Sequence, residues 1–242
     1  MTLASLALAL SLLSPAEPAG ASTLYRATLV QAAPGRLLEL IEWQRTLAAS
    51  WPDSGDDAPL AMRHSQGDKW DLLLLYPMGS WMDFFRADRV TRRDRWNQAS
   101  EATRVKVRDA IAWQEDVFAY GPPLAEVRER FAKAGFFHVE MFVALPGRQA
   151  DLYRQREMEN AYDRSLGLPQ NLIFTRDRGA AWDVFTIGCY RDLKHFAESA
   201  DLPEAAQEAA AKAAGFESAR AIGPYLRTLI REHRDTLATA IR

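Results

Sequence analysis

The chain has 242 residues, of which 48% are hydrophobic and 26% charged, and its formal net charge is −2. This length suits one large domain or two of ordinary size, and either could bury a substantial core. The near-neutral net charge argues against nucleic acid or an acidic membrane surface as a partner. The basic cluster Arg89–Arg95 contains Asp94 and follows Asp88, so we interpret it as a solvated helix face.

The first residues differ in composition from the rest of the chain. Leu3 to Leu13 form an apolar run that is too short to span a bilayer. Ala19-Gly20-Ala21 then fits the small-x-small rule for signal cleavage. We therefore predict a secretory signal peptide at residues 1–21, no stable membrane insertion after its removal, and a periplasmic or secreted protein. No Lys or Arg precedes the run, and a short buried helix is the alternative.

The periodicity of the first half predicts the order strand, helix, strand, strand, helix, strand. The predicted strands span residues 24–31, 60–64, 70–76 and 116–120, and the predicted helices span 36–49, a segment from Trp81 that Ser80 caps, and 98–113. Gly121-Pro122-Pro123 ends the last of these strands, and a linker helix is predicted at 124–133.

The second half repeats this order and ends in a longer helical region. The predicted strands span residues 136–144, 171–175, 182–188 and 236–241, and the predicted helices span 148–165, 192–199, 203–214 and a segment from Ser218 that Gly223-Pro224 breaks. The single cysteine, Cys189, falls at a strand end and excludes an internal disulfide. No set of His and Cys residues has metal-ligand spacing, so we predict no metal site.

Four landmarks recur in the same order in the two halves. The strand from Tyr25 aligns with the strand from His138, Pro34-Gly35-Arg36 with Pro146-Gly147-Arg148, Gly67 with Gly179, and Asp116 with Asp235. In this alignment the second Pro-Gly turn lies one residue closer to its strand than the first. We predict a tandem duplication with repeats at residues 22–123 and 135–242, joined by a linker helix at 124–134.

This element order resembles the dimeric α+β barrel superfamily in a fused, two-copy form, and the sequence is similar in texture to its NIPSNAP and antibiotic-biosynthesis-monooxygenase-like branch. A four-stranded sheet with helices on one face has a bare face that a second sheet can cover. The resemblance implies an α+β fold of two tandem ferredoxin-like units whose antiparallel sheets form an intramolecular barrel. It also implies binding of a small organic ligand or a cofactor-independent oxygenase-like activity.

Strand alternation predicts which side chains enter the barrel. We expect His138, Glu140 and Phe142 inside and Val139, Met141 and Val143 under the helices. The other side chains expected inside are Asn171, Ile173, Thr175, Trp182, Val184 and Thr186 in the second half, and Tyr25, Ala27, Leu29, Trp70, Leu72, Leu74 and Tyr76 in the first. This places a ligand cavity in the C-terminal half, with Asn171, Thr175, Trp182 and Thr186 as ligand-binding residues.

His138 and Glu140 are the candidate catalytic residues, because they lie two apart on one strand and a carboxylate can orient an imidazole as a general base. The alternative is a buried polar pair in which each satisfies the other. Arg156 shares a helix face with Asn160 and could offer its charge to an anionic ligand at the barrel mouth. The alternative for Arg156 is a solvated helix held by local ion pairs.

The superfamily resemblance leaves the cofactor unknown. Its haem-degrading monooxygenases use a Trp on the third strand, a His on the next helix and an Asn on the first strand. Trp182 and His195 match the first two positions, but the strand from His138 has no Asn, which argues against haem degradation. Haem ligation through His195 or His138 stays open, as do a homodimer and a non-catalytic interaction or scaffold protein.

Overall fold

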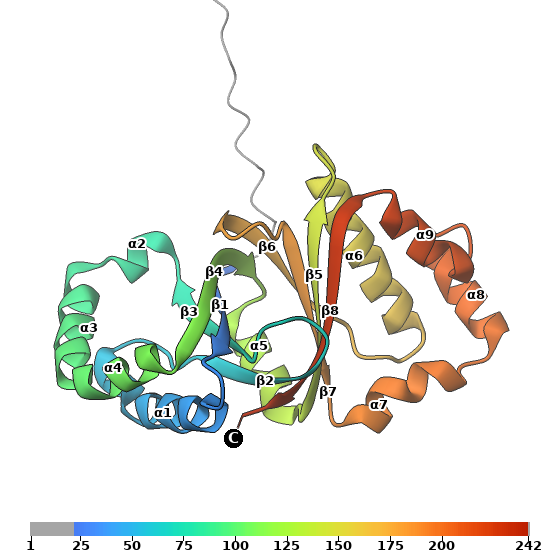
Figure 1. Cartoon of the computed structure of the whole chain (residues 1–242). Coiled ribbons are helices and arrows are strands. Elements are labelled where there is room, and N and C mark those ends of the chain that lie inside the picture. The colour runs from blue at the N-terminus through green and yellow to red at the C-terminus, as the bar shows by residue number, and fades with distance from the viewer. Residues whose placement is uncertain (1–21, 242) are drawn as a thin grey trace, which may run out of the picture.

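The structure is a computed structural model that describes residues 22–241, so the predicted signal peptide lies outside the described residues. Every pair of neighbouring strands is antiparallel. The sheet closes into a barrel in the order β1-β3-β2-β8-β5-β7-β6-β4 (Figure 1). The strands are β1 Thr23–Ala32, β2 Leu60–Gln66, β3 Leu72–Gly79, β4 Ile111–Gly121, β5 Phe136–Ala144, β6 Leu172–Gly179, β7 Val184–Tyr190 and β8 Ile230–Ala240. The predicted α+β class and the antiparallel sheet are confirmed.

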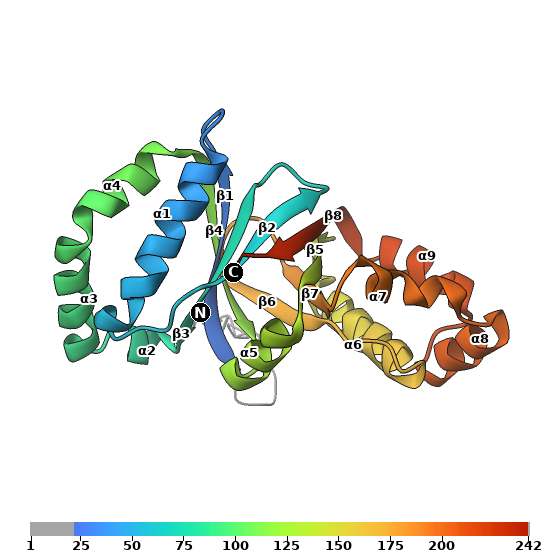
Figure 2. The same ribbon diagram turned by 90° about the horizontal axis from the view of Figure 1, so that it is seen from below.

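Helices cover the barrel on two opposite sides, one for each half of the chain (Figures 1 and 2). The first half contributes α1 Leu37–Ser50, the 3-10 turn η1 Trp51–Ser54, α2 Trp81–Phe84, α3 Ala87–Ala99 and α4 Glu101–Asp109. The second half contributes α6 Gln149–Ser165, α7 Leu193–Ala197, η2 Glu198–Asp201, α8 Glu204–Ala213, η3 Ala219–Ala221 and α9 Ile222–Arg227 on the opposite side. The linker helix α5 Leu124–Lys133 lies between the two sides, and its Val127 belongs to the apolar cluster of the barrel interior. None of these helices combines the length and the apolar character needed to cross a membrane.

The element boundaries differ from the predicted ones mainly where strands carry polar residues. β4 begins at Ile111, inside the segment predicted as helix to 113, and β8 begins at Ile230 rather than at 236. Gly223-Pro224 does not break α9, because Pro224 falls in its first turn, where no helical N–H bond is lost. The predicted cap is confirmed: the Ser80 side chain accepts a hydrogen bond from the backbone N–H of Asp83.

Two glycines lie at the seams where strands of the two halves meet. Gly67, after β2, has φ +129°, and a Cβ there would lie 2.2 Å from the carbonyl oxygen of Asp235 in β8. Gly179, at the end of β6, has φ +101°, and its Cβ would lie 2.6 Å from the carbonyl oxygen of Asp116 in β4. Only a residue without a side chain permits both the backbone conformation and the close approach.

We expect Gly179→Ala to lower the free energy of unfolding by roughly 2 kcal/mol or more, since it combines the cost of positive φ with a backbone clash. Urea unfolding measures this change. Gly35→Ala is the matched control, because Gly35 also has positive φ (+76°) but nothing lies within 4 Å of its added Cβ. Equal losses in the two variants would show that the seam contact is unimportant.

The barrel interior is the largest apolar cluster in the described residues, and all eight strands contribute to it. Val139 and Met141 of β5 and Phe185 of β7 pack there with Ala27 and Leu29 of β1. A pocket among these side chains has a volume of only about 10 Å³, which leaves no room for an organic ligand. Two further apolar clusters lie between the sheet and its covering helices, one in each half of the chain.

The predicted side-chain directions are therefore correct for the first strand but wrong for most of the others. Tyr25, Ala27, Leu29, Trp70 and Trp182 do pack inside the barrel. The residues predicted inside that instead belong to the helix-covered clusters or pack against them are Leu72, Leu74, Tyr76, Phe142, Ile173 and Val184. Because strand side chains alternate, His138, Glu140 and Thr186 share the outer face with Phe142 and Val184, beneath the helices.

A one-residue slip in the comparison of the first strands of the two halves accounts for the wrong directions in β5. Thr28 pairs with Asp116 across β1 and β4, and Glu140 pairs with Asp235 across β5 and β8. Ala32 and Ala144 occupy corresponding positions next to a bulge in these ladders. The strands thus correspond at a constant offset, with Arg26 rather than Tyr25 opposite His138, and a slip of one residue exchanges the two faces.

Candidate functional site

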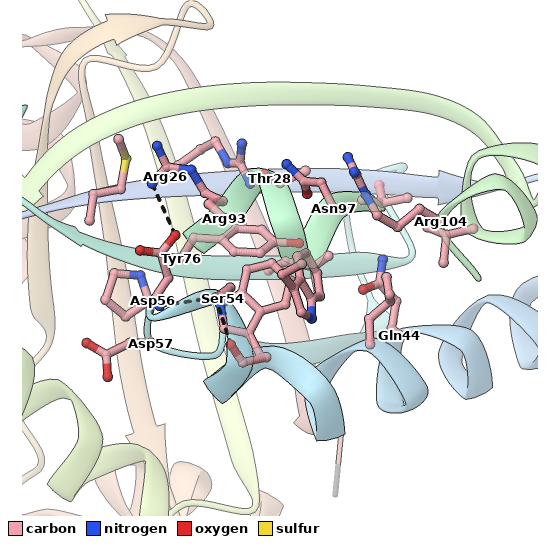
Figure 3. Close-up of a pocket in the computed structure, with 18 of the residues that line it drawn as sticks. Arg26, Thr28, Gln44, Ser54, Asp56, Asp57, Tyr76, Arg93, Asn97 and Arg104 are labelled. Carbon is pink, nitrogen blue, oxygen red and sulfur yellow. Dashed lines mark hydrogen bonds and ion pairs between the residues drawn. The ribbon is translucent and has the colours of Figure 1, made fainter. Parts of the chain in front are cut away.

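A pocket of about 450 Å³ lies between the outer face of β1, β3 and β4 and the helices α1, α3 and α4 (Figure 3). We call it the helix-covered pocket. Its sheet side includes Arg26, Thr28, Tyr76 and Gln114, and its helix side includes Gln44, Trp51, Arg93, Trp96, Asn97 and Arg104. Figure 3 shows Arg26, Asn97 and Arg104 along one edge and Gln44 and Ser54 along the other.

Arg26 is the charged residue of this pocket that has no counter-ion in the part of the chain that the structure describes. Its guanidinium carbon lies 4.3 Å from the centre of the Tyr76 ring. Arg26 makes no ion pair with any residue between 22 and 241, and its buried Nε has no hydrogen-bond partner there. Burial raises the pKa of Tyr76, against the smaller effect of Arg26 beside it, so the phenol stays protonated. A ligand anion would supply the missing charge.

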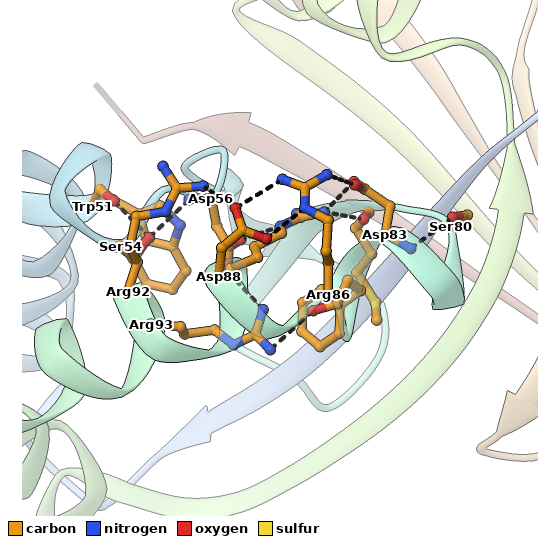
Figure 4. A network of polar contacts seen from close by, with 12 residues as sticks. Trp51, Ser54, Asp56, Ser80, Asp83, Arg86, Asp88, Arg92 and Arg93 are labelled. Atoms are coloured by element: carbon orange, nitrogen blue, oxygen red, sulfur yellow. Dashed lines mark hydrogen bonds and ion pairs between the residues drawn. The ribbon is translucent and has the colours of Figure 1, made fainter.

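The second arginine, Arg93, is held in the pocket wall by a network of ion pairs (Figure 4). Its guanidinium lies 3.2 Å from Asp56 and donates to the carbonyl oxygen of Phe84. Buried Arg89 binds the same Asp56 at 2.5 Å and also Asp83. These contacts join α2 and α3 to the loop after η1, so we regard Arg93 and Asp56 as structural parts of the pocket.

Aromatic rings form the apolar part of the helix-covered pocket. Trp51 lies with its ring centre 5.4 Å from that of Tyr76 and 4.6 Å from that of Trp96. The indole N–H of Trp51 is buried and has no hydrogen-bond partner in the described residues. A flat apolar body can therefore pack against these rings while a polar group accepts from the indole.

The predicted catalytic pair belongs to a second site, on the outer face of β5, β7 and β8. We call His138, Glu140, Arg156, His233 and Asp235 the charged cluster. Glu140 accepts hydrogen bonds from Arg156 at 3.2 Å and from the Thr186 hydroxyl at 2.9 Å. His138 Nε2 lies 3.0 Å from Asp235 Oδ1. The structure thus brings together four predicted site residues, His138, Glu140, Thr186 and Arg156.

His233 lies between the two carboxylates of the charged cluster. Its Nε2 is 3.3 Å from an oxygen of Glu140 and 3.3 Å from an oxygen of Asp235, as an ion-pair contact without a hydrogen bond. Burial alone would lower the pKa of His233, but Asp235 and Glu140 outweigh it and raise the pKa to about 9. The pKa of His138 is raised as well, since Asp235 and Glu140 again outweigh burial.

The pKa values of the two carboxylates in the charged cluster shift in the opposite direction to those of the histidines. Burial opposes ionisation of Asp235 and Glu140, but their histidine and arginine partners outweigh it and lower both pKa values. On the helix side, burial and the nearby charge of Glu159 raise the pKa of Asp163 to about 7. Because the raised pKa values of the histidines and the lowered pKa values of the carboxylates all favour the charged forms, the charged cluster is a mutually paired network rather than a free general base.

Sequence reasoning missed His233 and Asp235 because both precede the predicted start of the last strand. One signal was present, since Asp235 was aligned with Asp116. His138, Glu140 and Asp235 each offer a ligand atom within 4.8 Å of the others. A cation would have to displace Arg156 and break the contacts between the histidines and the carboxylates, so these residues do not fit a metal ion.

The remaining predicted residues lie in three separate places. Asn171 and Thr175 line a pocket of about 340 Å³ near α5 and α6, where Asn160 bonds the backbone of Asn171. Trp182 packs in the barrel core, with the Arg234 guanidinium 4.8 Å from its ring centre. His195 lies on α7, where its Nδ1 accepts a hydrogen bond from the backbone of Arg191.

The histidines do not fit a haem. None of the four lines the helix-covered pocket. His138 Nε2 contacts Asp235, and Asp235 and Glu140 raise the pKa of His138, which disfavours the neutral imidazole that iron ligation requires. His195 uses Nδ1 for the Arg191 backbone, and its Nε2 lies 4.0 Å from Glu198.

No protein-family model and no curated protein matches the sequence. Solved structures do match. They include an anthrone oxidase-like protein, with a TM-score of 0.58, 10% identity and 93% of each chain covered. A candidate monooxygenase from Fusobacterium nucleatum gives 0.55, 8% identity and coverage of 92% of this chain and 94% of that one. A similar protein from Lactobacillus acidophilus gives 0.54, 8% identity and coverage of 91% and 95%. At such identities these likenesses establish the ferredoxin-like α+β barrel fold alone.

Proposed function

We propose that this protein binds a small planar organic anion in the helix-covered pocket. The observation that carries the proposal is Arg26, a partly buried guanidinium without a counter-ion beside aromatic rings. A volume of about 450 Å³ falls in the usual range of small-molecule sites. We therefore place the proposed site in the first half rather than in the C-terminal half, because Arg26 lines this pocket.

Naphthoate is a suitable probe, with uncharged naphthamide as its matched partner. We expect calorimetry to show naphthoate binding at least about tenfold more tightly than naphthamide, since a charge-assisted hydrogen bond contributes roughly 1.5–3 kcal/mol. Arg26→Gln should weaken naphthoate binding by about ten- to a hundredfold for the same reason. The affinity for naphthamide should change little.

Arg95→Gln is the control, because Arg95 is exposed on α3 and does not line the pocket. Both variants remove one positive charge, so a general electrostatic effect would weaken naphthoate binding in both. Equal affinities of the wild type for naphthoate and naphthamide would contradict the proposal, and failure to bind either would favour the scaffold alternative.

A second candidate is oxygenase-like turnover of the bound ligand. Asp116 accepts a hydrogen bond from Thr28 at 2.5 Å, which puts a carboxylate base next to the pocket, and Arg26 could stabilise the resulting carbanion. Anthrone is a suitable substrate, because it loses a ring C–H proton and reacts with O₂ to give anthraquinone and water. Oxygen uptake with anthrone that Asp116→Asn abolishes would support this candidate, and uptake equal to the uncatalysed rate would exclude it.

We also infer that the mature protein consists of two tandem ferredoxin-like units and is exported. The constant offset between the strands and the matching turns at Gly35 and Gly147, with φ +76° and +78°, support the duplication. Export rests on the sequence of residues 1–21. An intact mass that begins at Ser22, measured on protein from the envelope fraction, would support it, and an intact mass that includes Met1 would contradict it.

A further inference from the structure

The helix-covered pocket and the charged cluster occupy corresponding places in the two halves. Arg36 and Arg148 precede α1 and α6 with nearly the same backbone angles, and buried Leu40 and Leu152 follow at the same distance. With the strand pairing already described, Thr28 corresponds to Glu140 and Gln44 to Arg156. By the same register Arg26 corresponds to His138 and Gln114 to His233.

In the second half, the chain itself fills this place with a carboxylate. Glu140 is 7% exposed, and its oxygens contact Arg156, Thr186 and His233. Arg156 reaches down from α6 and stacks 4.6 Å from the ring centre of Phe142. The carboxylate of Glu140 is thus bound by groups on the sheet and on the covering helix.

In the first half, the position of Glu140 holds Thr28 and so has no carboxylate. The neighbouring carboxylate is Asp116, which corresponds to Asp235 and accepts hydrogen bonds from Thr28 and from Gln114. Thr28 ends in a short hydroxyl that is bonded to Asp116. Arg26, Gln44 and Gln114 all line the pocket, at the positions of His138, Arg156 and His233. Each of the three can donate hydrogen bonds to an anion.

We propose that the helix-covered pocket is a carboxylate site, in which the ligand's carboxylate takes the position that the Glu140 carboxylate holds in the second half. This inference rests on the proposed function and specifies the class of anion. A flat carboxylate matches the planar guanidinium of Arg26 and the planar side-chain amides better than a tetrahedral sulfonate does. Naphthoate should therefore bind more tightly than naphthalenesulfonate.

The first test supplies the missing carboxylate from the chain. Thr28→Glu places one where Glu140 lies in the second half, and we expect it to weaken naphthoate binding by at least about tenfold. Thr91→Glu, on the exposed face of α3 and outside the pocket, adds the same charge and should leave the affinity within about threefold.

The second test strengthens the site and does not depend on folding of Thr28→Glu. Gln44→Arg supplies the guanidinium that Arg156 provides in the second half, and we expect naphthoate to bind about three- to tenfold more tightly, with naphthamide unchanged. Gln98→Arg, on the exposed face of α3, is the charge-matched control. The combined variant Thr28→Glu/Gln44→Arg should melt at a higher temperature than Thr28→Glu alone and should not bind naphthoate.

These results separate the inference from the proposed function. Suppose that the wild type binds naphthoate, but that Thr28→Glu has the same affinity for it or Gln44→Arg has no higher affinity than the wild type. Either result would overturn the proposed carboxylate position and leave the proposed anion pocket intact. Sulfonate binding as tight as naphthoate binding would have the same meaning. Wild-type protein that binds neither anion would overturn both.

Discussion

Arg156→Ala is expected to lower the free energy of unfolding by about 3–5 kcal/mol, because it removes the guanidinium that pairs with buried Glu140 and with Glu159 and leaves Glu140 only His233 as a counter-charge. The Arg156 side chain is 2% exposed and contacts Glu140, Glu159 and Gln155. It also stacks on the ring of Phe142, so apolar packing is lost as well. In a chain of this size the change corresponds to a fall in melting temperature of roughly 10 °C, which calorimetry would measure.

Arg148→Ala is the control for this prediction. Arg148 lies just before the same helix and pairs with Asp151, but both side chains are about half exposed, at 55% and 45%. An exposed pair of this kind contributes less than about 1 kcal/mol. The double variant Glu140→Gln/Arg156→Met should recover part of the loss, since it removes both charges. Arg156→Ala that melts like Arg148→Ala would show that the charged cluster does not stabilise the fold.

The order of strands and helices could be predicted because its signals are local. The β-rich composition of β1 and β5, the Pro-Gly turns before α1 and α6, and the Ser80 cap all depend on residues close in sequence. The start of β8 at Ile230 could not be found in this way. Its first residues are mostly charged, and only their partners on β5 and α6 make burial of such side chains favourable.

The candidate site was harder to predict than the fold, because burial on both faces removes the signal that orients a strand. β5 is buried along nearly its whole length, so its apolar residues do not reveal which face enters the barrel. His138, Glu140 and Arg156 lie together as one cluster, but on the outer face of the sheet rather than inside the barrel where the first two were predicted. The residues that line the helix-covered pocket are spread along the sequence from Arg26 to Gln114, and together they form no sequence motif.

The stability of the protein is expected to fall between about pH 6.5 and 9, because His233 has a raised pKa in the folded state. A group whose folded pKa exceeds its unfolded value stabilises the fold fully below the unfolded pKa, and this contribution is lost as the pH rises through the folded pKa. For His233, the difference between about 9 and the ordinary 6.5 corresponds to roughly 3 kcal/mol at most. The pKa of Asp163 is raised to about 7, so this group also makes the free energy of unfolding fall as the pH rises toward neutral.

His233→Gln isolates this contribution. The groups that face His233 are Glu140 and His138 on β5, Asp235 on β8 and Arg156 on α6, and all four remain in the variant. The difference in unfolding free energy between wild type and variant, measured by urea unfolding, should be constant below about pH 6.5 and should shrink toward pH 9. Arg148→Ala should give a pH profile parallel to the wild type. A wild-type-to-His233→Gln difference that stays constant up to pH 9 would mean that His233 is uncharged in the fold, and Glu140 would then depend on Arg156 alone for its counter-charge.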